Sequence, residues 1–137
     1  MTLLVYSKKT DSAEERLFRV IGLLMPEKKF ELYRSINDLS KRLRQPVFNP
    51  RIAIFLASSR KDIQDILSIR ELLEDTKIIL IVPDTNPDTV AQGHALRPRF
   101  LSDCNSDFVD VAAVLGQMIR KLGQNNNTDV HDKQAGS

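Results

Sequence analysis

The stretch Lys77-Ile78-Ile79-Leu80-Ile81-Val82 decides the fold. An unbroken run of β-branched and leucine side chains predicts a strand covered on both faces, as in the centre of a parallel sheet. Two further apolar runs, at 2–6 and 51–57, predict strands of the same kind. The shorter and more polar runs at 30–36 and 100–101 suit the two edges of that sheet.

Helical periods separate these strands. Ser12 and Glu15 have the spacing of a capping box, and an apolar stripe follows it until Pro26. Asn37 is the expected N-cap of a second helix, and Ser59 with Asp62 begins a third. The residues expected to face the core on these three helices are Leu17, Val20, Ile21 and Leu24, then Leu39 and Leu43, then Ile63, Ile66, Leu67, Arg70 and Leu73.

Two more helices complete the alternation. Asn86-Pro87 combines an N-cap with proline at the first helical position, and the helix after it runs to about Ala95. The last helix begins at Ser106 or Asp107 and is expected to end at Gly123. Its apolar stripe consists of Phe108, Val111, Ala112, Leu115, Met118, Ile119 and Leu122.

Strand and helix therefore alternate five times, which predicts an α/β fold with a parallel sheet and right-handed crossovers. We expect a flavodoxin-like three-layer sandwich with strand order 2-1-3-4-5, the first and last helices covering one face. Residues 1–123 form this single domain. Residues 124–137 are polar and without period, and are predicted to be a disordered tail.

Composition narrows the class of protein. The 137-residue chain has one cysteine, Cys104, which excludes an internal disulfide framework and a Cys-cluster zinc site. It has no apolar run long enough for a transmembrane helix, and its N-terminus is apolar before it is basic, unlike a secretory signal. We expect a cytoplasmic protein that binds no metal or other cofactor.

The order and lengths of these elements resemble the receiver domain of two-component response regulators, over residues 2 to 122. Receivers carry an acidic pair after strand 1, a phosphoacceptor aspartate after strand 3, a hydroxyl residue after strand 4 and a lysine after strand 5. Three carboxylates hold Mg²⁺, which requires hard oxygen ligands. In this chain Ser7 and Lys8 follow the first strand, and Leu56 or Ala57 stands at the end of the third. Val82 and Pro83 follow the fourth strand, and Asp103 follows the fifth.

The resemblance thus implies a pseudo-receiver, a non-catalytic signalling module that binds proteins independently of phosphorylation. Receivers bind partners through helix 4, strand 5 and helix 5, so the matching surface is expected to bind a protein partner or, in a homodimer, a second copy. Its candidate residues are Val90, Phe100, Val109, Ala113, Val114, Gln117 and Arg120.

Two other functions remain open. A flavodoxin-like enzyme could hold a phosphate-bearing ligand at the loop 7–12, although that loop has no glycine to let the backbone wrap a phosphate. A nucleic-acid-associated protein could use the segment Lys28 to Lys61, which has nine basic residues and only two acidic ones, but no interleaved aromatic stripe.

Asp11, Asp84 and Asp103 could form a displaced metal site, but capping and turn formation is the more ordinary role. Cys104 has no nearby base and is expected to be a bystander thiol.

Overall fold

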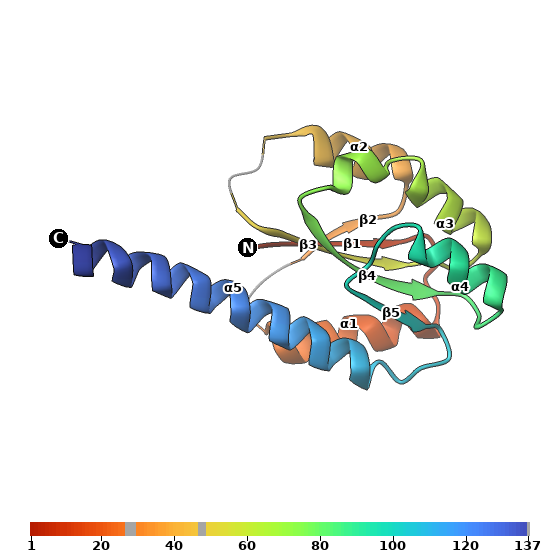
Figure 1. Cartoon of the computed structure of the whole chain (residues 1–137). Helices are drawn as coiled ribbons and strands as arrows, with labels where there is room; N and C mark the ends of the chain where they lie inside the picture. The colour runs from red at the N-terminus through yellow and green to blue at the C-terminus, as the bar shows by residue number, and fades with distance from the viewer. Residues whose placement is uncertain (27–29, 47–48, 137) are drawn as a thin grey trace.

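The strands form one parallel sheet. The computed structural model describes residues 1–26, 30–46 and 49–136, with side chains as far as Leu122. Within these residues the sheet has five strands in the order β2-β1-β3-β4-β5, as predicted for a flavodoxin-like fold (Figure 1). Their bounds are β1 (Thr2–Ser7), β2 (Glu31–Tyr33), β3 (Arg51–Leu56), β4 (Thr76–Val82) and β5 (Phe100–Asp103).

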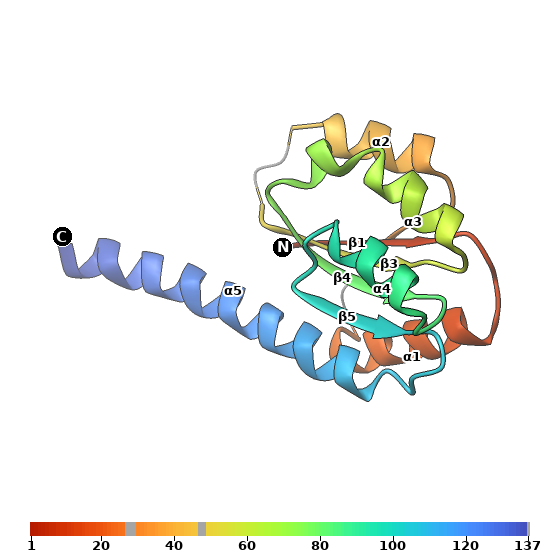
Figure 2. The ribbon, with the colours of Figure 1, turned by 45° about the vertical axis from the view of Figure 1, so that its right-hand side comes forward.

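The helices lie on both faces of the sheet. Helices α1 and α5 cover one face, and α2, α3 and α4 cover the other, as predicted (Figure 2). None of the helices within the described residues is long and apolar enough to span a bilayer. Their bounds are α1 (Ser12–Leu24), α2 (Ile36–Arg44), α3 (Arg60–Leu67), the 3₁₀ turn η1 (Arg70–Leu73), α4 (Pro87–His94) and α5 (Val109–Gly136).

Alternation along the strands divides the core into two layers. Leu3 and Val5 of β1 pack beneath α1 and α5, while Leu4 and Tyr6 pack beneath α2 and α3. The central strands β3 and β4 continue both layers, because successive side chains of a strand point to opposite faces. Two-sided burial explains why these strands read as continuous apolar runs.

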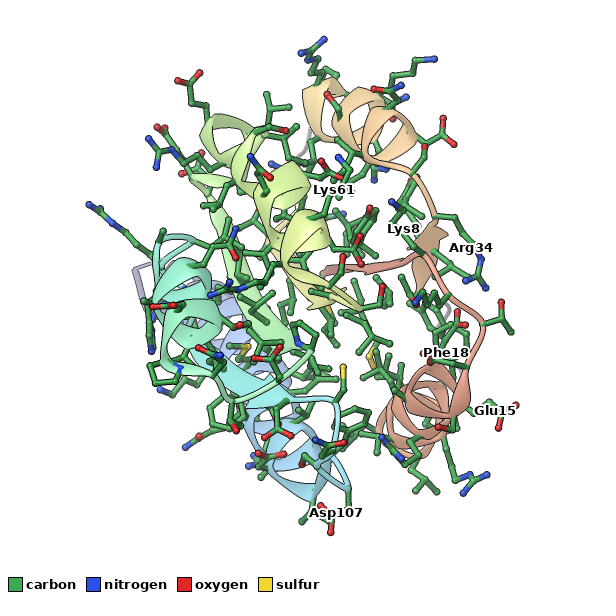
Figure 3. All side chains as sticks on the ribbon, turned by 90° about the vertical axis from the view of Figure 1, so that its right-hand side faces the viewer. Lys8, Glu15, Phe18, Arg34, Lys61 and Asp107 are labelled. Carbon is green, nitrogen blue, oxygen red and sulfur yellow. The ribbon has the colours of Figure 1, made fainter. Side chains whose placement is uncertain are left out.

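The starts of α1, α3 and α4 agree closely with the sequence predictions. Ser59 caps α3 and Asn86 caps α4, as predicted. The expected cap at Ser12 is wrong by one residue, because the Asp11 side chain accepts the N–H of Glu14 at 3.0 Å. Glu15 is therefore not part of a capping box, and it points away from the domain (Figure 3).

The second β-α unit differs most from expectation. Ser35 rather than Asn37 caps α2, since its hydroxyl accepts the N–H of Asp38. Strand β2 is correspondingly short, and Ile36 belongs to the helix. Of the predicted inward residues, Leu24 and Arg70 are exposed, and the buried Met25 and Ile69 lie next to them in the chain.

Helix α5 continues beyond Gly123, where it was expected to end, and its C-terminal part projects away from the sheet (Figure 1). A glycine lowers helix propensity by about 1 kcal/mol but does not by itself terminate a helix. The side chains after Leu122 lie outside the described residues. The division into a domain of residues 1–123 and a polar tail of 124–137 stays a prediction.

Candidate functional site

The carboxyl ends of the strands meet at one edge of the sheet, which we call the carboxyl edge. Ser7 pairs with Leu56 in the strand register, and Val82 pairs with Asp103. The Ala57 N–H donates to the carbonyl of Ile81 at 2.9 Å, which extends the pairing past the end of β3. The structure therefore brings the positions expected to match a receiver site onto a common edge.

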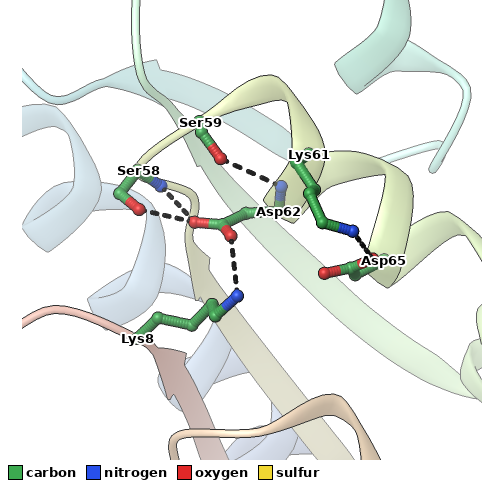
Figure 4. A network of polar contacts seen from close by, with 6 residues as sticks. All are labelled: Lys8, Ser58, Ser59, Lys61, Asp62 and Asp65. Carbon is green, nitrogen blue, oxygen red and sulfur yellow. Dashed lines mark hydrogen bonds and ion pairs between the residues drawn. The ribbon is translucent and has the colours of Figure 1, made fainter.

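The centre of this edge is a buried carboxylate that sequence reasoning treated only as a helix-cap partner. Asp62 is 2% exposed, and its Oδ2 accepts the Ser58 N–H at 2.8 Å and the Ser58 hydroxyl at 2.6 Å (Figure 4). Its Oδ1 lies 3.5 Å from the Lys8 Nζ (Figure 4). One side chain thus ties the start of α3 to the loop after β1. We call these contacts the Lys8–Asp62 network.

The network keeps its carboxylate ionised. Burial alone would raise the pKa of Asp62, but the two Ser58 hydrogen bonds and the Lys8 ammonium together lower the pKa below its usual value. Burial, with the charges of Asp62 and Asp65, raises the pKa of the nearby Tyr6 hydroxyl to about 12. Both groups therefore stay in their ordinary charge states at neutral pH.

A second buried carboxylate, Glu14, lies at the start of α1 and was not predicted from the sequence. It is 1% exposed, and its Oε1 lies 2.8 Å from a guanidinium nitrogen of Arg34. Arg34 also donates to the Ser7 carbonyl at 3.2 Å, so it joins the loop after β2 to the end of β1. Figure 3 shows Arg34 beside Lys8 at this edge. The only indication of this burial in the sequence was that Glu14 directly follows the apolar Ala13 in the first turn of the helix.

The loop after β5 is fixed by contacts of the Arg16 guanidinium and of the Cys104 thiol. Arg16 donates to the carbonyl of Cys104, and its guanidinium lies 5.2 Å from the centre of the Phe108 ring. The Cys104 thiol lies 3.6 Å from the carbonyl of Ala57. Burial, with the charges of Asp11 and Asp103, raises the pKa of this thiol to about 11. Such a thiol is a poor nucleophile at neutral pH.

The three aspartates considered as a displaced metal site have local partners. Asp11 accepts the Glu14 N–H, Asp84 the Asn86 N–H and Asp103 the Asn105 N–H, each at 2.9 to 3.0 Å. These are cap and turn contacts. In the part of the chain that the structure describes, no three His, Cys, Asp or Glu side chains gather closely enough to hold a metal ion.

The predicted interaction residues divide into an exposed stripe and a set of half-buried positions. Val109 is 66% exposed, and Ala113, Gln117 and Arg120 are exposed at successive turns of α5. This stripe is called the α5 stripe below. The half-buried residues are Val114 and Phe100, which pack against the α1–α5 side of the core, and Val90, which lies on α4 across the sheet.

Carboxylates neutralise part of the basic segment 28–61. Besides Arg34, its members Arg42, Arg60 and Lys61 lie within 2.7 to 3.6 Å of acidic oxygens. The Arg42 hydrogen bonds hold the pKa of its partner Glu31 below its usual range, against the opposing effect of burial. Two further basic residues of the segment, Lys28 and Lys29, lie outside the described residues.

Comparison with known proteins adds no relative. No family model matches the chain, and no curated protein matches its sequence. The expected resemblance to receivers therefore depends on the order of the elements alone, because the matching positions at the carboxyl edge hold other residues.

Proposed function

We propose that this chain is a non-catalytic protein-interaction module with a receiver-like fold, of the kind used in two-component signalling, and that it works without phosphorylation. The observation that carries the proposal is the Lys8–Asp62 network at the carboxyl edge. Lys8 Nζ lies 3.5 Å from a carboxylate of α3, at the edge where a receiver gathers carboxylates around Mg²⁺.

The chemistry of this edge supports that proposal. A phosphoacceptor needs a carboxylate at the end of β3, and Leu56 and Ala57 have no atom that could bond to phosphorus. A cation repels Mg²⁺: two unit charges about 4 Å apart interact by about 4 kcal/mol at an effective dielectric near 20, and a divalent ion doubles that energy. Asp62 is already neutralised by Lys8 and occupied by Ser58.

The α5 stripe is the proposed contact surface. Val109 is one of the most exposed large apolar side chains in the described part of the chain, and it begins a face with Ala113 one turn later. Exposed apolar residues rimmed by polar ones, here Gln117 and Arg120, are typical of protein contacts.

The same contacts count against the two other functions. In the loop after β1, Lys8 is paired with Asp62, and the Ser7 hydroxyl donates to the Lys9 carbonyl at 3.2 Å. These donors are therefore engaged within the domain rather than available to a phosphate. The ion pairs of Arg42 and Arg60 similarly reduce the positive field that a nucleic acid would require.

Phosphorylation independence is tested by treatment with acetyl phosphate and Mg²⁺ followed by intact-mass spectrometry. We expect no gain of a phosphoryl group, and no change in the spectrum of backbone amides on adding beryllofluoride. A stoichiometric, Mg²⁺-dependent gain of one phosphoryl group would overturn the proposal. The Lys8→Met variant removes the cation alone, and it should still gain no phosphoryl group, because β3 ends without a carboxylate.

The contact surface is tested by sedimentation velocity over a range of concentrations. Val109→Glu should shift a dimer toward monomer without changing the circular dichroism spectrum. Leu23→Glu is the matched control, since Leu23 is 80% exposed on α1, outside the α5 stripe. An unchanged dimer in Val109→Glu, or a dimer lost only in Leu23→Glu, would remove the α5 stripe from the proposal.

A further inference from the structure

A groove of about 640 Å³ lies at the opposite edge of the sheet, between η1 and the loop that joins α4 to β5. Its lining includes the buried apolar side chains of Leu73, Ile78 and Leu96. Three arginines from two segments, Arg70, Arg97 and Arg99, also line it. None of these residues belongs to the carboxyl edge or to the α5 stripe, so the groove is separate from the proposed function.

Arg97 and Arg99 lie on a loop that backbone hydrogen bonds fix in place. Arg97 has a φ of 53°, in the left-handed region that favours glycine, and Pro98 follows it. The Arg97 N–H donates to the His94 carbonyl at 2.9 Å, and the Arg99 N–H donates to the Ile78 carbonyl at 2.8 Å. An arginine kept in an unfavourable conformation beside a groove is an observation that suggests a function for its side chain.

The three guanidinium groups also form no ion pair with the carboxylates that the structure describes. The ion pairs found within the described residues involve Lys8, Arg34, Arg42, Arg60 and Lys61, and none involves the arginines of this groove.

We propose that this groove binds an acidic peptide segment, with carboxylates on the arginines and an apolar side chain against Leu73 and Leu96. A guanidinium group matches a carboxylate with two parallel hydrogen bonds. Glu71 and Glu74 also line the groove. They would repel the continuous phosphates of a nucleic acid, whereas a peptide can place single carboxylates apart from them.

The test is fluorescence anisotropy with a labelled peptide, blocked at both ends, that carries one glutamate on each side of a leucine. A peptide with glutamine in place of both glutamates is the control ligand, and a single-stranded oligonucleotide is the competitor. Arg97→Gly removes the guanidinium while suiting the positive φ, so it separates binding from backbone strain. Arg99→Ala removes the second guanidinium, and Arg19→Ala is the control for lost charge, since Arg19 is exposed on α1.

We expect the glutamate peptide to bind, with an affinity that falls about ten-fold in Arg97→Gly and in Arg99→Ala and stays unchanged in Arg19→Ala. Binding should weaken as salt is added, because the contacts are between charges. The proposal is overturned if the glutamate peptide shows no binding at millimolar protein, if the glutamine peptide binds equally well, or if both groove variants bind as wild type. Tighter binding of the oligonucleotide, lost in the same variants, would replace the peptide with a nucleic acid.

Discussion

Lys8 and Asp62 meet at the carboxyl edge, with Nζ 3.5 Å from Oδ1, and join the loop after β1 to the first turn of α3. The two side chains differ in exposure: the Lys8 side chain is 41% exposed and the Asp62 side chain 4%. The ammonium can therefore remain hydrated while it compensates a carboxylate that has lost most of its water. The Ser58 hydrogen bonds supply the rest of that compensation.

This arrangement predicts a loss of stability in acid. The folded pKa of Asp62 is lowered from 3.8, so its contribution to stability is fully present above that value and is lost as the pH falls through the folded pKa. Asp62→Asn should remove this part of the pH dependence. It should also lower the free energy of unfolding at pH 7 by about 1 to 2 kcal/mol, because neutral acceptors form weaker hydrogen bonds than charged ones. Urea unfolding at several pH values between about 2 and 5 measures the pH dependence, and the same measurement at pH 7 gives the difference in stability.

Asp65→Asn is the matched control for that measurement. It makes the same change of charge on the same helix, but Asp65 pairs with the exposed Lys61 at 3.6 Å. Exposed ion pairs of this spacing contribute only about 0.3 to 0.5 kcal/mol. Equal slopes of stability against pH in wild type and Asp62→Asn would contradict the assignment of the acid-sensitive group.

The fold could be predicted because its signals are local and repeated. The run at 77–82 has the composition that two-sided burial imposes, and the alternation of strand and helix fixes the parallel arrangement. The caps of α3 and α4 were predictable for the same reason, since a cap residue and its partner lie within three residues. The cap of α1 was misplaced because Asp11 and Ser12 are both good N-cap residues. Which of them caps the helix depends on the path of the chain into α1, which the local sequence does not specify.

The site could be predicted only in part. The sequence placed Ser7, Lys8 and Leu56 at the carboxyl edge, because strand ends follow directly from strand positions. It did not place Asp62 or Glu14 in the interior, since a charged residue in a first helical turn is ordinarily solvated. Their burial depends on Lys8 and Arg34, which come from other β-α units and whose side-chain directions no local pattern encodes.

A pair of glycines tests the packing of the helices on the sheet. Gly93 of α4 lies against the sheet, where an added Cβ would be 3.0 Å from side-chain carbons of Leu80 and Leu101, whereas at Gly22 of α1 it would meet nothing within 4 Å. Crowding of these side chains should cost about 1 to 3 kcal/mol, and the gain in helix propensity offsets about 1 kcal/mol of it, so Gly93→Ala should lower the free energy of unfolding by up to about 2 kcal/mol. Gly22→Ala should raise it by about 0.5 to 1 kcal/mol through helix propensity. Urea unfolding of both variants checks this, and a stabilised Gly93→Ala would show that α4 packs less closely than described.

Cys104 offers a test of the loop after β5 that needs no substitution. Its pKa of about 11 is caused first by burial and then by the charges of Asp11 and Asp103, which the Arg16 guanidinium only partly offsets. The thiolate is the reactive form, so at pH 8 about one thiol in a thousand would be ionised, against roughly a quarter of ordinary thiols. We expect Ellman's reagent to modify the folded protein at least a hundred times more slowly than the protein unfolded in urea.

The pH dependence of that modification separates the two causes of slowness. If ionisation limits the rate, it should rise about ten-fold per pH unit from pH 7 to 9.5 in the folded protein. A rate that does not change with pH would instead indicate that opening of the loop is limiting. Arg16→Met removes the cation that contacts the Cys104 carbonyl and the Phe108 ring. It should speed the reaction if loop opening is limiting, and slow it if ionisation is limiting, because the lost cation no longer lowers the pKa of the thiol. Fast modification of the wild-type protein at pH 7 would contradict both the burial of the thiol and the closed loop around it.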